Sequence, residues 1–63
     1  MEEYKDRVFK EANHLARKIR KLEIFITSNT FEKVSYDEQF ALRLQKMFMI
    51  SYLDILNSRI ERF

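Results

Sequence analysis

The sequence predicts an all-α protein, an antiparallel two-helix hairpin that assembles into a homo-oligomeric helical bundle. Three observations lead to this fold class. The 63 residues include no glycine and no proline, so nothing in the chain breaks a helix from within. Apolar residues recur at helical spacing in two long stretches. A hydrophobic content of 46% with 35% charge is ordinary for a packed helical protein and too apolar for a disordered one.

We expect the first helix over about residues 2–27. Its apolar residues recur mostly at alternating spacings of four and three. This spacing gives a narrow stripe with a period of about 3.5 residues, which is typical of a helix that packs along one line against another helix. The stripe consists of Tyr4, Val8, Ala12, Leu15, Ile19, Leu22 and Ile26.

A short link is expected over residues 28–35. In a chain without glycine, Asn29 is the best candidate for a left-handed residue that ends the first helix. Phe31 and Val34 are expected to fold back and close the open end of the hairpin.

We expect the second helix over about residues 36–62. Ser35 and Glu38 have the spacing of a capping box, with Ser35 as the N-cap. The two helices have similar lengths and the link between them is short, so the sequence predicts an antiparallel hairpin that forms one domain over residues 1–63.

The second helix carries two apolar stripes, whereas the first helix offers only one. On a helical wheel the first stripe consists of Leu42, Met49, Leu53, Leu56 and Ile60. The second, adjacent stripe consists of Leu44, Phe48, Tyr52 and Ile55. One hairpin covers one of them, and an exposed apolar patch usually marks an interface. Leu44, Phe48, Tyr52 and Ile55 are therefore the predicted interface of a homo-oligomer, either a dimer, a tetramer or a larger assembly. The alternative is that Phe25, Phe31 and Phe40 cover this stripe within one chain.

The sequence shows no catalytic constellation and no glycine-rich phosphate loop. It has no cysteine and a single histidine, so one chain cannot supply a Cys-based or multi-His metal site. His14 lies off the apolar stripe and is expected to be a surface residue. We therefore expect a protein that is not an enzyme and that holds no cofactor and no metal.

The stretch "ARKIRK" concentrates positive charge on the first helix. Arg17, Lys18, Arg20 and Lys21, extended by Lys10, are expected opposite its apolar stripe. One interpretation is a solvated face with ion pairs along the helix. The other is an anion site that oligomerisation multiplies, with a tyrosine (Tyr4, Tyr36 or Tyr52) stacking on a base. Net charge is only +2 and no recognition-helix motif is present, so nucleic acid is an unlikely partner.

No apolar run reaches the roughly 18 residues of a membrane span, so we expect no membrane partner. The first stretch, "MEEYKD", is acidic where a signal peptide is basic. The expected location is the cytoplasm.

Several polar residues at fixed places in the apolar pattern carry a family resemblance: Arg7, Lys18, Lys21, Gln45 and Arg59. Over essentially its whole length the chain resembles the crAss-phage-related proteins of unknown function, which are small helical proteins of phages and prophages. It departs from their pattern in the "SNT" link and in the crowded "KMFMI". Leu44-Gln45 and Phe48-Met49 are also similar to a stretch in phage sponge proteins, oligomeric helical hairpins that sequester cyclic-oligonucleotide immune signals.

The resemblance implies a phage-encoded protein that acts in the cytoplasm of the bacterial host. The leading hypothesis is an anti-defence protein that binds and sequesters a nucleotide-type immune signal at its subunit interfaces. Arg7, Lys18, Lys21 and Arg59 would contact phosphates, and Tyr4 or Tyr52 would stack on a base. The alternative is a small inhibitor that binds a host defence protein or CRISPR effector directly. A DNA-binding repressor is a third hypothesis.

Overall fold

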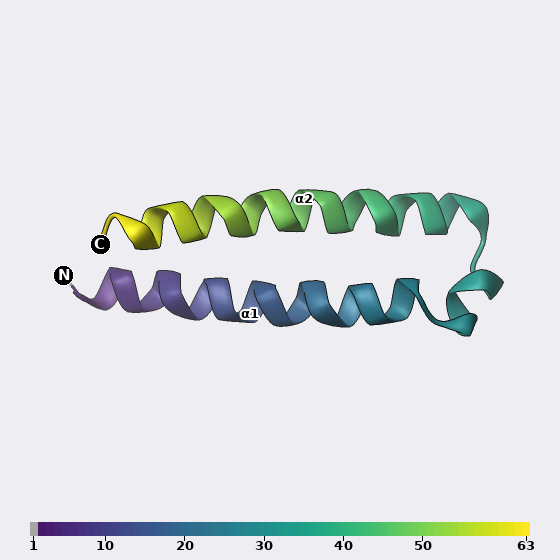
Figure 1. The fold of residues 1–63 in the computed structure, drawn as a ribbon, viewed down its shortest axis with the longest axis horizontal. Coiled ribbons are helices and arrows are strands. Elements are labelled where there is room, and N and C mark those ends of the chain that lie inside the picture. Colours follow the sequence, from purple (N-terminus) through teal and green to yellow (C-terminus); the bar gives the residue numbers. More distant parts are fainter. Residues whose placement is uncertain (1) are drawn as a thin grey trace.

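Two long helices lie side by side and antiparallel in the computed structural model, which describes residues 2–63 (Figure 1). Helix α1 spans Glu2–Ile26, the 3₁₀ helix η1 spans Asn29–Lys33, and helix α2 spans Tyr36–Glu61. The two long helices each end one residue earlier than the sequence predicts. The predicted all-helical hairpin is confirmed, whereas its assembly into an oligomer stays a prediction. Met1, which the predicted domain includes, lies outside the described residues.

The core follows the line along which α1 and α2 meet. Its buried residues are Val8, Ala12, Leu15 and Ile19 of α1 and Leu56 of α2. Three residues of α2 pack against them while partly buried: Met49, Leu53 and Ile60. Leu56 is completely enclosed, with 0% of its surface exposed. The narrow stripe of α1 therefore packs against the first stripe of α2, as the spacing predicts.

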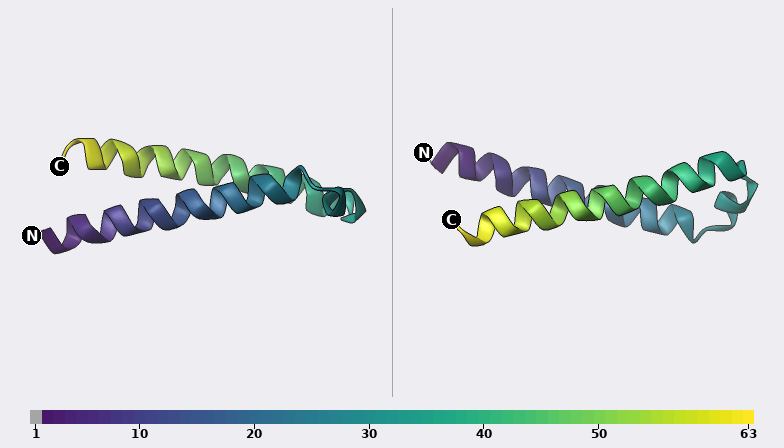
Figure 2. Two further views of the ribbon diagram at one scale, coloured as in Figure 1. Left: turned by 60° about the horizontal axis from the view of Figure 1, so that its bottom comes forward. Right: turned by 90° about the horizontal axis from the view of Figure 1, so that it is seen from above.

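Contacts between the helices fix their register. The Lys46 ammonium lies 4.0 Å from a Glu23 carboxylate oxygen, and the Phe63 ring contacts α1 near its first turns. Together with the core, these contacts place Ile19 level with Met49. The helices stay close along their length and cross at a small angle, with both termini at one end and the link at the other (Figure 2).

Aromatic side chains close the end of the hairpin where the termini meet. The ring of Phe63 lies edge-on to Tyr4 and to Phe9, with centroids 5.8 and 5.7 Å apart. The Lys5 ammonium lies 5.4 Å from the centroid of the same ring. Edge-to-face aromatic pairs and cation–π contacts are both favourable, so this cluster holds the last residue of the chain against α1.

The link reverses the chain without a left-handed residue. No residue among 2–63 has a positive φ angle, so the expectation that Asn29 adopts the left-handed conformation is wrong. Instead Ser28 is extended, with φ −89° and ψ 161°, and its hydroxyl accepts a hydrogen bond from the Phe31 amide at 3.4 Å. This side chain caps η1, which begins at Asn29 and turns the chain toward α2. A serine cap thus replaces the left-handed turn for which a glycine is usually needed.

Phe31 closes the link end of the hairpin, as predicted. It is buried, and its ring lies edge-on to Phe25 with centroids 5.7 Å apart. The Gln39 amide donates hydrogen bonds to the carbonyls of Phe31 at 3.1 Å and Val34 at 2.8 Å. One side chain of α2 therefore satisfies two backbone acceptors of the link and fixes η1 on the end of the helix pair.

The predicted N-cap of α2 is confirmed. The Ser35 hydroxyl accepts a hydrogen bond from the Glu38 amide at 3.3 Å, which satisfies a backbone donor that the helix itself leaves free. Asp37 and Glu38 lie in the first turn of α2, where the helix dipole favours negative charge.

We expect Leu56→Ala to lower the free energy of unfolding by about 2–5 kcal/mol, because the substitution leaves a cavity in a fully enclosed site. Urea unfolding followed by circular dichroism measures the loss, with both proteins at the same concentration. Ser51→Ala, at an exposed site on the same helix, is the control and should stay within about 0.5 kcal/mol of the parent. Equal stabilities for the two variants would contradict the assigned core.

We also expect Gln39→Met to lower the free energy of unfolding by about 1–3 kcal/mol, because the Val34 carbonyl loses the hydrogen bond from Gln39 and the Phe31 carbonyl keeps that from the Val34 amide alone. Gln45→Met is the matched control, since Gln45 is exposed and its amide contacts only the Met49 sulfur, at 3.9 Å. Thermal unfolding of both variants makes the comparison. If the control loses as much stability as Gln39→Met, the hydrogen bonds to the link contribute nothing.

Candidate ligand-binding face

Four of the six predicted ligand residues follow one edge of the line where the helices meet. They are Tyr4 and Lys18 on α1 and Tyr52 and Arg59 on α2. Tyr4 and Lys18 are two heptads apart, and Tyr52 and Arg59 are one heptad apart. Each pair therefore shares one side of its helix. Arg59 is half-buried, whereas the other three side chains are exposed. We call these four residues, together with Arg7 and Lys21, the cationic face.

Around α1, Arg7 and Lys21 lie farther than Tyr4 and Lys18 from the side that packs against α2. They are two heptads apart on α1 and both are exposed. The Arg7 guanidinium lies 3.5 Å from a Glu3 carboxylate oxygen, in an exposed pair of the kind that contributes little to stability. Glu11 is exposed on the same side, between Arg7 and Lys18, so the face is interrupted by acid.

The basic stretch of α1 divides between two sides of the helix. Lys18 and Lys21 belong to the cationic face, whereas Arg17, at the same heptad position as Lys10, points away from α2. All four side chains are exposed. Helical spacing therefore leaves two lysines of "ARKIRK", and not the whole stretch, on the side that carries the predicted ligand residues.

The two tyrosines of the cationic face have different surroundings. Tyr4 already lies edge-on to Phe63 within the chain, with centroids 5.8 Å apart. Tyr52 is 43% exposed and therefore does not belong to the enclosed core. Tyr52 is the better placed of the two to offer a ring face to a ligand.

The second stripe of α2 lies in solvent. Phe48 is 69% exposed and Ile55 is 59% exposed, while Leu44 is half-buried. The alternative that phenylalanines of the same chain cover it is wrong, because Phe25 contacts Phe31 at the link and Phe40 is itself 66% exposed. The use of this stripe as an oligomer interface stays a prediction.

Apolar residues are also exposed on the other side of α2. Phe40, Met47 and Ile50 lie on the flank away from the cationic face, and neither predicted stripe of α2 includes them. The run of apolar residues in "KMFMI" was the feature of the sequence that could have indicated this second exposed flank. These residues fall outside both predicted stripes, because apolar side chains lie around much of the circumference of α2.

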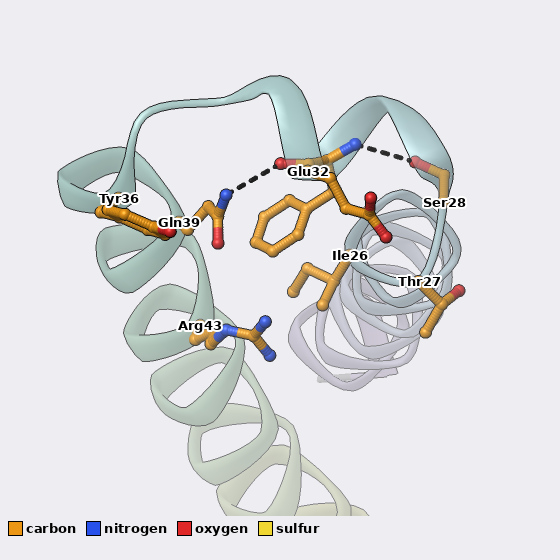
Figure 3. Close-up of a pocket in the computed structure, with 8 residues that line it drawn as sticks. Ile26, Thr27, Ser28, Glu32, Tyr36, Gln39 and Arg43 are labelled. Carbon is orange, nitrogen blue, oxygen red and sulfur yellow. Dashed lines mark hydrogen bonds between the residues drawn. The ribbon is translucent and has the colours of Figure 1, made fainter.

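A hollow of about 580 Å³ opens at the link end (Figure 3). It is lined by Ile26, Thr27, Ser28, Phe31, Glu32, Tyr36, Gln39 and Arg43. The Arg43 guanidinium carbon lies 5.1 Å from the centroid of the Phe31 ring. Tyr36 is almost fully exposed at the rim. Of the tyrosines considered for stacking, only Tyr36 reaches it, and the six predicted ligand residues lie elsewhere. Sequence reasoning missed this hollow because the fold of the link creates it.

Across residues 2–63 no three side chains of the metal-binding types gather into a possible ion site. Neither long helix, within that same range, has the length of apolar surface needed to cross a bilayer.

A comparison with known protein families gives a match. The family model of Sequestin aligns with residues 2–62. No curated protein and no solved structure matches the chain. The family name points to a sequestering function, which agrees with the sponge-like protein expected from the sequence, while the resemblance to the crAss-phage-related proteins stays a prediction. Because the match includes both long helices and the link, the chain belongs to the Sequestin family.

Proposed function

We propose that this protein is a phage-encoded anti-defence protein that sequesters a nucleotide-type immune signal in the cytoplasm of the bacterial host. It acts by stoichiometric capture, without catalysis, and lowers the concentration of free signal. The observation that carries the proposal is the Sequestin match over residues 2–62 of a hairpin that bears a cationic face.

The chemistry of the cationic face suits a phosphate-bearing ligand. Lys18 and Lys21 belong to neither of the ion pairs found among the described residues, which join Arg7 to Glu3 and Lys46 to Glu23. Their ammonium groups are available as donors to phosphate oxygens. Arg59 adds a guanidinium that binds phosphate with two parallel hydrogen bonds. Tyr52 supplies an aromatic surface on which a base can stack.

The shape of one hairpin argues for capture by an oligomer. Its Cα atoms extend over 47 × 14 × 13 Å, so the protein is a rod only two helices thick. Binding pockets usually enclose most of a small ligand, whereas the cationic face lies along the outside of this rod. We therefore place the ligand between subunits, with the exposed stripe of Leu44, Phe48, Tyr52 and Ile55 as the interface.

Direct inhibition of a host defence protein or CRISPR effector is the second candidate. It is favoured by the exposed apolar side chains on both flanks of α2, among them Phe40, Met47 and Phe48. Large apolar residues of this kind often anchor a protein partner. In that case the cationic face would be an ordinary solvated surface.

Native mass spectrometry distinguishes the two candidates. The protein is measured alone and with cyclic dinucleotides, cyclic trinucleotides and ADP-ribose derivatives. Sequestration predicts an oligomer that gains a small whole number of ligands and a melting temperature that rises with ligand concentration. If the oligomer retains none of these compounds and its melting temperature does not change, direct inhibition becomes the better candidate.

We expect the double substitution Lys18→Ala/Lys21→Ala to weaken binding of the retained nucleotide by about 10- to 100-fold, because charged hydrogen bonds to phosphate are lost. Melting should change little, since both side chains are exposed. Isothermal titration calorimetry measures the affinity. Lys10→Ala/Arg17→Ala removes the same charge from the other side of α1 and should bind normally. A loss that is equal in both variants would mean that general charge, and not the cationic face, holds the ligand.

A further inference from the structure

The residues of the exposed stripe of α2 are spaced symmetrically about Phe48. Phe48 stands at its centre, with Leu44 four residues before it and Tyr52 four residues after. Ala41 and Ile55 lie seven residues to either side, on the same side of the helix as Phe48. Phe48, Tyr52, Ile55 and Ala41 are exposed, and Leu44 is half-buried.

An antiparallel copy of α2 fits this stripe better than a parallel one. When two copies run in opposite directions about a twofold axis at Phe48, Phe48 meets its own copy and Leu44 meets Tyr52. The small Ala41 then lies level with the larger Ile55, so small and large side chains alternate across the contact. A parallel pair would set Ala41 against Ala41 and leave a gap between the helices at that level.

The charges of α2 favour the same orientation. Its first turn carries Asp37 and Glu38, its last turn carries Arg59, and Arg62 follows as its C-cap. Antiparallel pairing about Phe48 brings Asp37 of one copy level with Arg59 of the other. Parallel pairing would place acid beside acid at one end and base beside base at the other. Exposed charges of this kind contribute modestly to affinity but decide orientation.

We propose that two copies of this protein pair through α2 in antiparallel orientation, with the twofold axis at Phe48. The contact is isologous, meaning that both copies use the same residues, as twofold dimers do. Asp37 at one end of each α2 faces Arg59 of the partner copy. The occupant of the exposed stripe is thus a second copy of this chain.

The pairing also has a consequence for ligand binding, which rests on the proposed function. Ile19 lies level with Met49, so Lys18 and Lys21 lie on either side of the level of Phe48. The cationic face borders the stripe on the same side of the hairpin. A twofold axis at Phe48 therefore brings Lys18 and Lys21 of both copies around one axis. The site that results suits a compact ligand with two phosphate groups, and neither copy forms it alone.

Cysteine cross-linking tests the pairing directly, because the natural chain has no cysteine. Ala41→Cys and Ile55→Cys proteins are oxidised separately and as a mixture. Antiparallel pairing at Phe48 predicts a disulfide-linked heterodimer in the mixture and little cross-linking of either protein alone, since identical positions are 14 residues, or about 21 Å, apart. Asn57→Cys, exposed on the opposite flank of α2, replaces Ile55→Cys as the matched control and should not cross-link to Ala41→Cys.

Two outcomes overturn the proposal. Self-cross-linking of Ala41→Cys alone would show a parallel pair or an antiparallel pair with another axis, and equal cross-linking of the Asn57→Cys control would show random collision. A second measurement does not depend on disulfide geometry. Phe48→Asp should raise the dimer dissociation constant by about 30-fold or more in native mass spectrometry, as the loss of a central anchor does. Unchanged dimer content in a variant whose helicity is intact would also refute it.

The pairing and the proposed function can fail separately. A specific Ala41–Ile55 cross-link in a protein that retains no nucleotide would leave the antiparallel dimer standing and reject sequestration of those ligands. Nucleotide binding by a protein that never forms this cross-link would leave sequestration standing and reject the axis at Phe48.

Discussion

The packing of one narrow apolar stripe against another determines the rest of this structure. On α1, helical spacing confines the buried residues to a single line, and Ala12 in its centre lets α2 approach closely. A rod of two helices has no room for a second layer of core. Leu56 is therefore fully enclosed, while most of the remaining apolar surface of α2 is left in solvent. The exposed stripe is a direct consequence of pairing a helix with one apolar line to a helix with several.

The link closes the hairpin without the residues that usually build tight turns. Three polar side chains stabilise the link: Ser28 caps η1, Ser35 caps α2, and Gln39 donates hydrogen bonds to two carbonyls between them. Phe31 fills the space under η1 and contacts Phe25. These side chains satisfy the amides of Phe31 and Glu38 and the carbonyls of Phe31 and Val34. The hairpin consequently keeps one register, and the residues of the cationic face keep their levels relative to Phe48.

Local spacing made the helices and their contact predictable from sequence. The alternation of fours and threes in α1 and the Ser35–Glu38 pattern depend only on neighbours along the chain, and both gave correct elements. The exposure of Phe48 and Ile55 followed from counting stripes. The left-handed Asn29 was wrong because the Ser28 hydroxyl offered the chain another way to turn.

Features that depend on the folded link were not predictable in this way. The hollow at the link end joins Ile26, Phe31 and Arg43, which come from three separate elements. Nothing in their spacing along the chain shows that η1 places the Phe31 ring against the Arg43 guanidinium. The cluster of Tyr4, Phe9 and Phe63 likewise depends on the register, which brings the two ends of the chain together.

The distribution of charge favours the proposed small ligand over a nucleic acid. A polymer binds along a continuous row of positive charge, and its affinity grows with each phosphate contacted. Here the net charge is only +2, and Glu3 and Glu11 interrupt the basic residues of α1. In the proposed dimer the positive charge is instead concentrated near one axis, where Lys18 and Lys21 of both copies converge. Such an arrangement holds a molecule whose phosphates lie close together, and it offers a long backbone little to bind beyond the first contacts. In the proposed dimer, selectivity for a compact ligand therefore comes from symmetry, because the cationic face lies along the outside of a rod two helices thick.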